Sequence, residues 1–234
     1  MSGPNDPTGT SARRPRLDRR RVARAAVELI DEQGVPALSM RRLGRRLGVE
    51  AMSLYAHVDG RESLLNQVID QVVDELYDDP ETHLHETDSW QDYLVRVAHG
   101  VRRSALAHPN VFPLVATRPP EAPWIRPPLR SLRWVEAFLS SLRRQGFTQD
   151  EAVYTYRAFT SFLLGHLLLE VAALTPPPAS AAKNERASPL HLEEYPNLRE
   201  LSGRLAENAA AQEFEESLDN LLTRLDAIRA YGTD

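Results

Sequence analysis

The stretch SMRRLGRRLGVEAMSLYAH, residues 39–57, decides how the rest of the chain is interpreted. Its first half carries Met40, Leu43 and Leu47 at helical spacing and ends at Gly48, where the chain can bend without a Cβ clash. A second short helix is predicted from about Glu50 to His57. Two short helices joined by a tight turn are typical of a helix-turn-helix, which lays its second helix in the major groove of DNA.

The second helix of this motif turns a distinctive set of side chains outward. Small residues at Ala51 and Ser53 let the backbone approach base edges, and Met52 lies between them. Tyr55 and His57 can hydrogen-bond phosphate oxygens. An isolated Tyr and His are better explained as a core residue and a surface cap, but their offset from the turn favours contact with DNA.

The charge of the chain is divided unevenly. Residues 1–65 hold twelve arginines against eight acidic residues, a net charge of +4, whereas the remainder holds 16 basic and 25 acidic residues, a net charge of −9. A basic head on an acidic body indicates that only the head meets a polyanion, although a solvated charge run gives the same counts. Arginines between Arg13 and Arg24 form either an arm that contacts DNA or a solubilising tail.

The apolar pattern is helical almost throughout, and no run of alternating β-branched residues appears, so the predicted fold is all-α with about nine or ten helices. We divide the chain into a disordered basic tail (1–16), a head with its connecting helix (17–77) and a body (78–234). A Pro-, Ala- and Ser-rich loop is predicted at 175–189. The expected helices are 18–33, 39–47, 50–57, 60–77, 89–107, 110–116, 127–145, 148–174, 190–203 and 207–230.

The chain shows no signal peptide, and its longest apolar stretch, Phe159–Leu174, is shorter than the ~20 residues that a membrane-spanning helix needs. We interpret it as a buried helix. The absence of cysteine excludes disulfides and thiolate chemistry and fits a reducing compartment. The expected location is therefore the cytoplasm.

Residues 19–65, RRRVARAAVELIDEQGVPALSMRRLGRRLGVEAMSLYAHVDGRESLL, resemble the N-terminal domain of the tetracycline-repressor (TetR) family of bacterial regulators. The segments LSMRRLGRRLGV and LYAHV fall at the spacings of that family. The resemblance implies a location at the bacterial nucleoid and assigns the contacts with double-stranded DNA. Ser39, Met40 and Arg41 would meet the DNA backbone, Ala51, Met52 and Ser53 would read bases, and Tyr55, His57 and Arg61 would contact phosphates.

The body is similar to the ligand domain of the tetracycline repressors proper over residues 89–120 and 138–170. It departs from them where they bind drug and metal. Leu114 replaces the metal-binding histidine, Val97 and Val101 stand where drug contacts are expected, and Leu169 replaces a carboxylate that holds a metal-bound water. We therefore expect no magnesium–tetracycline site, no metal and no cofactor.

An apolar effector is expected instead, since ligand pockets are mostly apolar with a few convergent polar groups. A hydrophobic molecule of aromatic or polyketide-like character fits the predicted walls. Each aromatic residue among them could equally be ordinary core, and Arg118 could cap a helix. The candidate ligand-binding residues are Val97, Val101, Leu114, Arg118, Trp134, Tyr156, Phe159, Phe162, Leu163 and His166.

One head reads too little DNA for specificity, so the body is expected to form a homodimer through the helices at 148–174 and 207–230. The predicted function is a repressor released from a palindromic operator by this effector. A ligand-blind or activating regulator of the same fold is the alternative. A metal-dependent enzyme based on His83 and His85 is the remaining alternative, but neither has a partner at metal-ligand spacing, and no phosphate loop or nucleophile elbow is present.

Overall fold

The computed structural model describes residues 17–118, 122, 124–126, 131–174 and 192–231, and all regular structure within these ranges is helical. Ten α-helices are present there, which confirms the predicted all-α fold. The basic tail at 1–16 and the loop at 175–189 lie outside the described residues. The division of the chain at 77 and 78 stays a prediction.

The head contains α1 (Arg19–Gln33), a 3₁₀ turn η1 (Val35–Ala37), α2 (Met40–Leu47) and α3 (Ala51–Leu54), followed by the connecting helix α4 (Arg61–Asp78). The side chains of Asp18 and Ser39 accept hydrogen bonds from the first turns of α1 and α2, as N-caps do. Gly48 ends α2 in the left-handed conformation, with φ at 69°. The sequence therefore predicted these boundaries, but α3 is shorter than the expected 50–57, and only turns continue to His57.

The body begins with a 3₁₀ turn η2 (Pro80–Thr82), then α5 (Trp90–Ala107), α6 (Phe112–Thr117), α7 (Leu132–Arg144) and α8 (Gln149–Leu174). Ser89 with Asp92 forms a capping box at the start of α5. The backbone N–H of Thr148 donates to the Glu151 carboxylate, and the backbone N–H of Glu151 donates to the Thr148 hydroxyl, so these two residues form a capping box before α8. For α7, the expected start at 127 lies outside the described residues, and Ser131 caps the helix.

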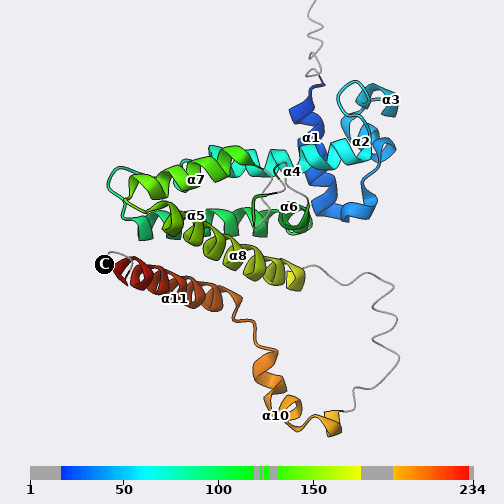
Figure 1. Ribbon diagram of the computed structural model, residues 1–234. Helices are drawn as coiled ribbons and strands as arrows, with labels where there is room; N and C mark the ends of the chain where they lie inside the picture. The colour runs from blue at the N-terminus through cyan, green and yellow to red at the C-terminus, as the bar shows by residue number, and fades with distance from the viewer. Residues whose placement is uncertain (1–16, 119–121, 123, 127–130, 175–191, 232–234) are drawn as a thin grey trace, which may run out of the picture.

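The C-terminal part contains η3 (Leu192–Glu194), α10 (Pro196–Leu205) and α11 (Ala210–Tyr231). The expectation of one helix at 190–203 was wrong, because Pro196 lacks an N–H and is accommodated only in the first turn, so the helix begins there. Figure 1 shows α11 beside α8, whereas α10 stands apart from the other helices and buries none of its residues.

Two hydrophobic clusters organise these helices. The cluster of the head gathers residues of α1 to α4, and the cluster of the body gathers residues of α5, α7, α8 and α11. The short helix α6 belongs to both: Val115 packs in the cluster of the head, and Phe112 and Ala116 pack in that of the body. Figure 1 shows α4 running from the head along the body. Head and body are thus joined by α4 and α6.

Helix α8 is, by length and composition, the one described helix that could cross a membrane. It packs against α5, α6, α7 and α11, and nine of its residues are buried, among them Phe159, Leu163 and Leu167. A core helix passes the same test of length and composition. These contacts support the interpretation of α8 as a buried helix.

Candidate functional site

The helix-turn-helix is held by a close approach between α2 and α3. Gly44 lies in the middle of α2, and a Cβ added there would stand 2.8 Å from the carbonyl oxygen of Val49 and 3.2 Å from the backbone nitrogen of Ala51. The Val49 N–H in turn donates to the Gly44 carbonyl across 2.9 Å. Because the atoms closest to this Cβ belong to the backbone, they cannot move aside as a flexible side chain could. The sequence analysis assigned the turn to Gly48 and missed the role of Gly44. A glycine inside an amphipathic helix is the signal that could have indicated a close approach there.

The face predicted to read DNA is open to solvent. Met52 is 74% exposed and Tyr55 48% exposed, which is high for large apolar and aromatic side chains, and Ser53 is exposed beside them. Arg41 is exposed in the first turn of α2, after Ser39. Ala51 is partly buried against α2, and Met40 packs partly into the cluster of the head. An exposed Met and Tyr on one short helix fit a surface that is covered by a partner.

Two further groups brace this surface. The side-chain amide of Gln67 on α4 donates to the carbonyl oxygen of His57 at 3.1 Å, so α4 positions the end of the segment at 51–57, the recognition segment. The Arg61 guanidinium donates to the carbonyl oxygen of Val35 at 3.2 Å while the residue stays exposed. Sequence analysis did not single out Gln67, because a lone Gln on a predicted helix carries no recognisable signal.

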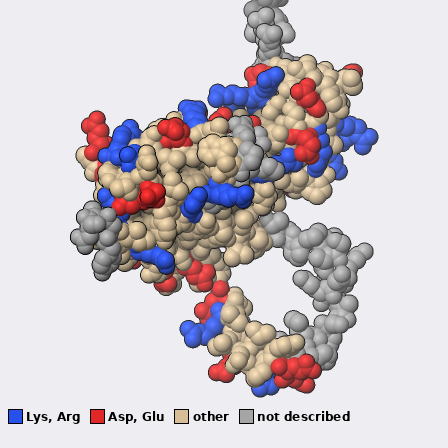
Figure 2. Space-filling model, in the orientation of Figure 1, with Lys and Arg blue, Asp and Glu red and all other residues tan. Residues whose placement is uncertain are grey.

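The arginines of the head do not all have the same role. Arg46 is tied to Glu28 and Glu32 at 2.9 and 2.7 Å, and these carboxylates raise the pKa of the Arg46 guanidinium. Arg46 is therefore a brace between α2 and α1. Figure 2 shows basic side chains over the surface of the head with acidic ones among them. The basic character read from the sequence is reduced where these pairs form.

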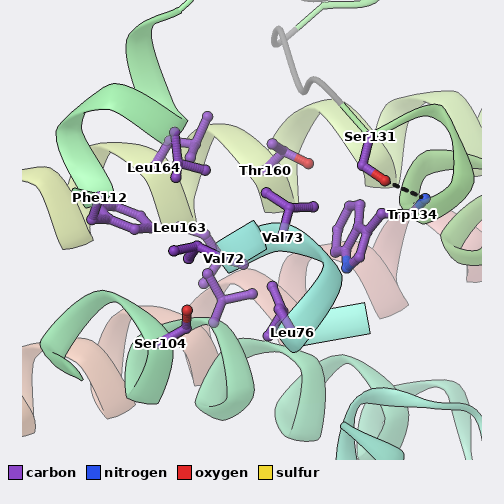
Figure 3. Close-up of a pocket in the computed structure, with 12 residues that line it drawn as sticks. Val72, Val73, Leu76, Ser104, Phe112, Ser131, Trp134, Thr160, Leu163 and Leu164 are labelled. Atoms are coloured by element: carbon purple, nitrogen blue, oxygen red, sulfur yellow. Dashed lines mark hydrogen bonds between the residues drawn. The ribbon is translucent and has the colours of Figure 1, made fainter. Parts of the chain in front are cut away.

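A cavity lies in the body, against the connecting helix. Its walls come from five helices, α4, α5, α6, α7 and α8, together with the cap of α7 (Figure 3). The space between its lining atoms measures about 610 Å³ and is partly open to solvent. The described lining residues are Val72, Val73, Leu76, Val101, Ser104, Phe112, Val115, Ser131, Trp134, Thr160, Leu163 and Leu164.

The chemistry of this cavity is almost entirely apolar. None of the lining residues in the described part of the chain is charged, and the polar ones are Ser104, Ser131 and Thr160. The Ser131 hydroxyl accepts from the backbone N–H of Trp134 at 3.1 Å. Such a space suits a hydrophobic small molecule and gives a divalent ion no ligand.

The structure brings three of the ten predicted pocket residues to this cavity: Val101, Trp134 and Leu163. Four others pack in the core of the body and do not line the cavity: Val97, Tyr156, Phe159 and Phe162. Phe159, for example, stacks on Phe138 with the ring centroids 5.5 Å apart. The His166 ring packs against Phe214 of α11 at 5.3 Å, and Leu114 packs against the cluster of the head. The contribution of α4 was missed, because its apolar stripe also fits ordinary packing.

Polar bridges join body and head beside the cavity. The Arg118 guanidinium, at the end of α6, lies 2.7 Å from the carboxylate of Glu62 on α4 and lowers the pKa of that carboxyl. On α1, the Asp31 carboxylate lies 2.7 Å from the His108 ring at the end of α5, and its hydrogen bond raises the pKa of His108. Arg118 thus contacts α4 and is absent from the described cavity lining.

No group of three or more His, Asp or Glu side chains within the described residues could hold a metal ion. The ring nitrogens of His83 and His85 lie 2.6 and 3.3 Å from the carbonyl oxygens of Tyr77 and Pro80. Both histidines therefore serve as local braces of the segment after α4.

The fold and these two sites define a helix-turn-helix protein whose body carries an apolar cavity against the connecting helix. The model of the family "Bacterial regulatory proteins, tetR family" matches residues 23–68, and that of the "Tetracyclin repressor-like, C-terminal domain" matches residues 82–228. The chain belongs to the TetR family of transcriptional regulators, with a C-terminal domain of the tetracycline-repressor type.

Individual relatives agree with this membership. The class D tetracycline repressor of Escherichia coli is 30% identical over 211 residues, 88% of each chain. An HTH-type transcriptional regulator of Saccharopolyspora erythraea is 30% identical over 164 residues, 70% of this chain and 65% of that protein, so the match spans just under two thirds of its length. The solved structure of Streptomyces coelicolor ActR in complex with actinorhodin superposes with a TM-score of 0.67 at 26% identity, covering 91% of this chain and 97% of that one.

Proposed function

We propose that this chain is a homodimeric repressor that binds a palindromic operator and releases it when an apolar effector enters the body. The observation that carries the proposal is the shared wall: Val72, Val73 and Leu76 of α4 line the cavity, and α4 also begins at the DNA-binding head. A molecule that favours one position of α4 therefore favours one position of the head. We place the protein in the bacterial cytoplasm, at the nucleoid, acting as a regulator and not as an enzyme.

In this proposal the head contacts DNA through its exposed face. Ala51, Met52 and Ser53 read bases, with Ala51 and Met52 doing so by apolar contact, for example with thymine methyl groups. Tyr55, His57 and Arg61 contact phosphates, as do Ser39, Met40 and Arg41 at the start of α2. Their support is their common position around α2 and α3 and the exposure of six of them, whereas Met40, Ala51 and His57 are partly buried. Gln67 holds the carbonyl of His57, so a shift of α4 also moves the end of the recognition segment.

The homodimer forms through α8 and α11. Phe214, Leu218, Leu222 and Leu225 of α11 pack within the subunit, which leaves the outer face of α8 for a partner. On that face Leu169 is 76% exposed, and Gly165 has open space where a Cβ would stand. An exposed leucine beside a glycine suits close packing against a second subunit and supports this assignment.

The effector acts through two connections between body and head. It occupies the cavity in place of magnesium–tetracycline, and α4 moves because it forms a wall of that cavity. Helix α6 follows, since Phe112 and Val115 line the cavity and Arg118 at its end holds Glu62. The heads then no longer match the spacing of two half-sites one DNA turn apart, ~34–36 Å. Ligand and DNA exclude each other because they prefer different positions of α4.

The test is footprinting of the purified protein on the intergenic DNA upstream of its own gene, with and without a panel of neutral apolar metabolites. We expect a palindromic footprint that one class of compound releases. The double variant Tyr55→Ala, His57→Ala should lose the footprint and keep the dimer, whereas Gly165→Arg, which fills the open space on the outer face of α8, should give monomers in sedimentation. Nanomolar binding by the double variant would overturn the DNA assignment. A footprint that no compound releases would favour a ligand-blind regulator.

A further inference from the structure

Thr160 carries a buried hydroxyl that forms no hydrogen bond within the described part of the chain. It lies on α8 and is 3% exposed, and its Oγ1 atom has no hydrogen-bond partner among the described residues. A hydroxyl removed from water without a partner destabilises the folded state. Helical Ser and Thr usually avoid this by donating to the carbonyl four residues earlier, as Thr117 and Ser141 do here at 2.6 and 2.8 Å.

This hydroxyl belongs to the cavity beside α4. Figure 3 shows Thr160 at the cavity with its oxygen on the side of Trp134, and Val73 lies across the space. The other polar groups of the lining differ from it: Ser131 is engaged as the cap of α7, and Ser104 is only partly buried, on α5. An unpartnered hydroxyl in an apolar space is a fixed hydrogen-bonding point for a molecule that fills the space.

We propose that the effector is an uncharged, largely apolar molecule with one carbonyl or hydroxyl oxygen, and that Thr160 selects it by donating a hydrogen bond to that oxygen. This inference rests on the proposed function, since it takes the cavity beside α4 to be the effector site. A charged effector is disfavoured because the described lining offers no countercharge for a desolvated ion.

The experiment uses two small probes of the same shape, 1-indanone, which has a ketone oxygen, and indane, which does not. Their dissociation constants are measured by NMR titration on the full-length protein and on Thr160→Val and Thr160→Ser. The quantity compared is the preference for indanone over indane. We expect Thr160→Val to lower it about five- to tenfold, the value of one neutral hydrogen bond, and Thr160→Ser to preserve it within about twofold. An unchanged preference in Thr160→Val, or no binding of either probe, would overturn the inference.

A second readout needs no ligand. Since Thr160→Val removes an unpartnered hydroxyl and keeps the shape of the side chain, it should raise the melting temperature, by about 1–3 °C. Ser141→Ala is the matched control, because that buried hydroxyl is bonded, and its loss should lower the melting temperature. A lower melting temperature for Thr160→Val would mean that the hydroxyl is already bonded and would contradict the proposal.

Operator binding is measured on the same preparations, so that failure of the proposed regulatory function can be distinguished from failure of the role inferred for Thr160. Discrimination between the probes without a footprint would count against the regulatory function alone. A footprint that some compound releases, with no discrimination at Thr160, would count against this inference alone.

Discussion

Head and body are both helical, but they place their functional groups in opposite ways. The predicted DNA contacts of the head fall within residues 39–61, and the apolar side chain among them that extends from α3, Met52, is 74% exposed. The cavity of the body draws its described lining from residues 72 to 164, and the buried, unpartnered hydroxyl of Thr160 within it belongs to a side chain that is 3% exposed. A surface made from one short segment depends on local turns, whereas a cavity depends on how distant helices meet. Variants in the two regions should therefore fail in different ways.

The largest effect is expected from Gly44→Ala in the head. The added Cβ would stand 2.8 Å from a backbone oxygen of the turn, so α3 must move relative to α2. We expect at least a 100-fold loss of operator affinity, measured by fluorescence anisotropy, because both helices contribute contacts. Probe binding by the body should stay within about twofold.

The matched control is Gly203→Ala in α10, another helical glycine, where an added Cβ meets nothing within 4 Å. It should leave operator affinity unchanged and slightly stabilise the helix, since Ala is favoured over Gly by roughly 1 kcal/mol. If Gly44→Ala behaved like this control, the close approach of α2 and α3 would not matter for DNA binding.

The next largest effect is a loss of stability from a substitution in the body that leaves the head unchanged. Arg102 on α5 holds Glu170 on α8 with two hydrogen bonds, of 2.6 and 3.0 Å, and the side chains are 19% and 8% exposed. Arg102→Met leaves a buried carboxylate without its cation, so we expect the free energy of unfolding to fall by about 3 kcal/mol in urea titrations at fixed protein concentration.

Adding Glu170→Leu to Arg102→Met should recover a large part of that loss, because the unpaired charge is then removed. Operator affinity per folded molecule should not change in either variant, since neither residue belongs to the head or lines the described cavity. A double variant as unstable as Arg102→Met alone would show that packing of the guanidinium against Phe214, 5.2 Å away, is the main contribution.

The same contrast explains what could be predicted from the sequence. Asp18, Ser39, Gly48 and Ser89 are local signals, and the helices begin or end where they indicate. The resemblance of the head supplied residue roles because its motif is contiguous. The cavity was recovered only in part: Trp134 and Leu163 line it, but Arg118 pairs with Glu62 instead. Periodicity tells which face of a helix is buried, but not whether that face meets a cavity or a neighbouring helix.

A smaller effect is expected where head and body meet at Arg118. Arg118→Gln removes the ion pair with Glu62 and loosens the link between α6 and α4. We expect operator affinity to change by about two- to fivefold, the size usual for a partly exposed pair, and to become less sensitive to the effector. Glu62→Gln should have the same effect, and the double variant should add little.

Arg103→Gln provides the control for this link. Arg103 is paired with Asp79 at 3.0 Å, so the variant loses a surface pair of the same kind without loosening the contact between α6 and α4. Equal changes in operator affinity for Arg103→Gln and Arg118→Gln would mean that general charge, and not the connection between α6 and α4, controls the head.

The smallest effect concerns the second bridge, between His108 and Asp31. The hydrogen bond to Asp31 and the negative charges of Asp31 and Glu75 outweigh partial burial and raise the pKa of His108 above its ordinary value of 6.5. Because the folded state holds this proton more tightly, the bridge stabilises the protein fully below that ordinary value and loses its contribution as the pH rises through the raised value. Between pH 6 and pH 8.5 the melting temperature of the wild type should therefore fall about 1–3 °C further than that of His108→Gln, in which the other histidines titrate unchanged. Asp31→Asn should remove the same difference. Identical pH profiles for the wild type and His108→Gln would show that the charged bridge between His108 and Asp31 does not contribute to stability.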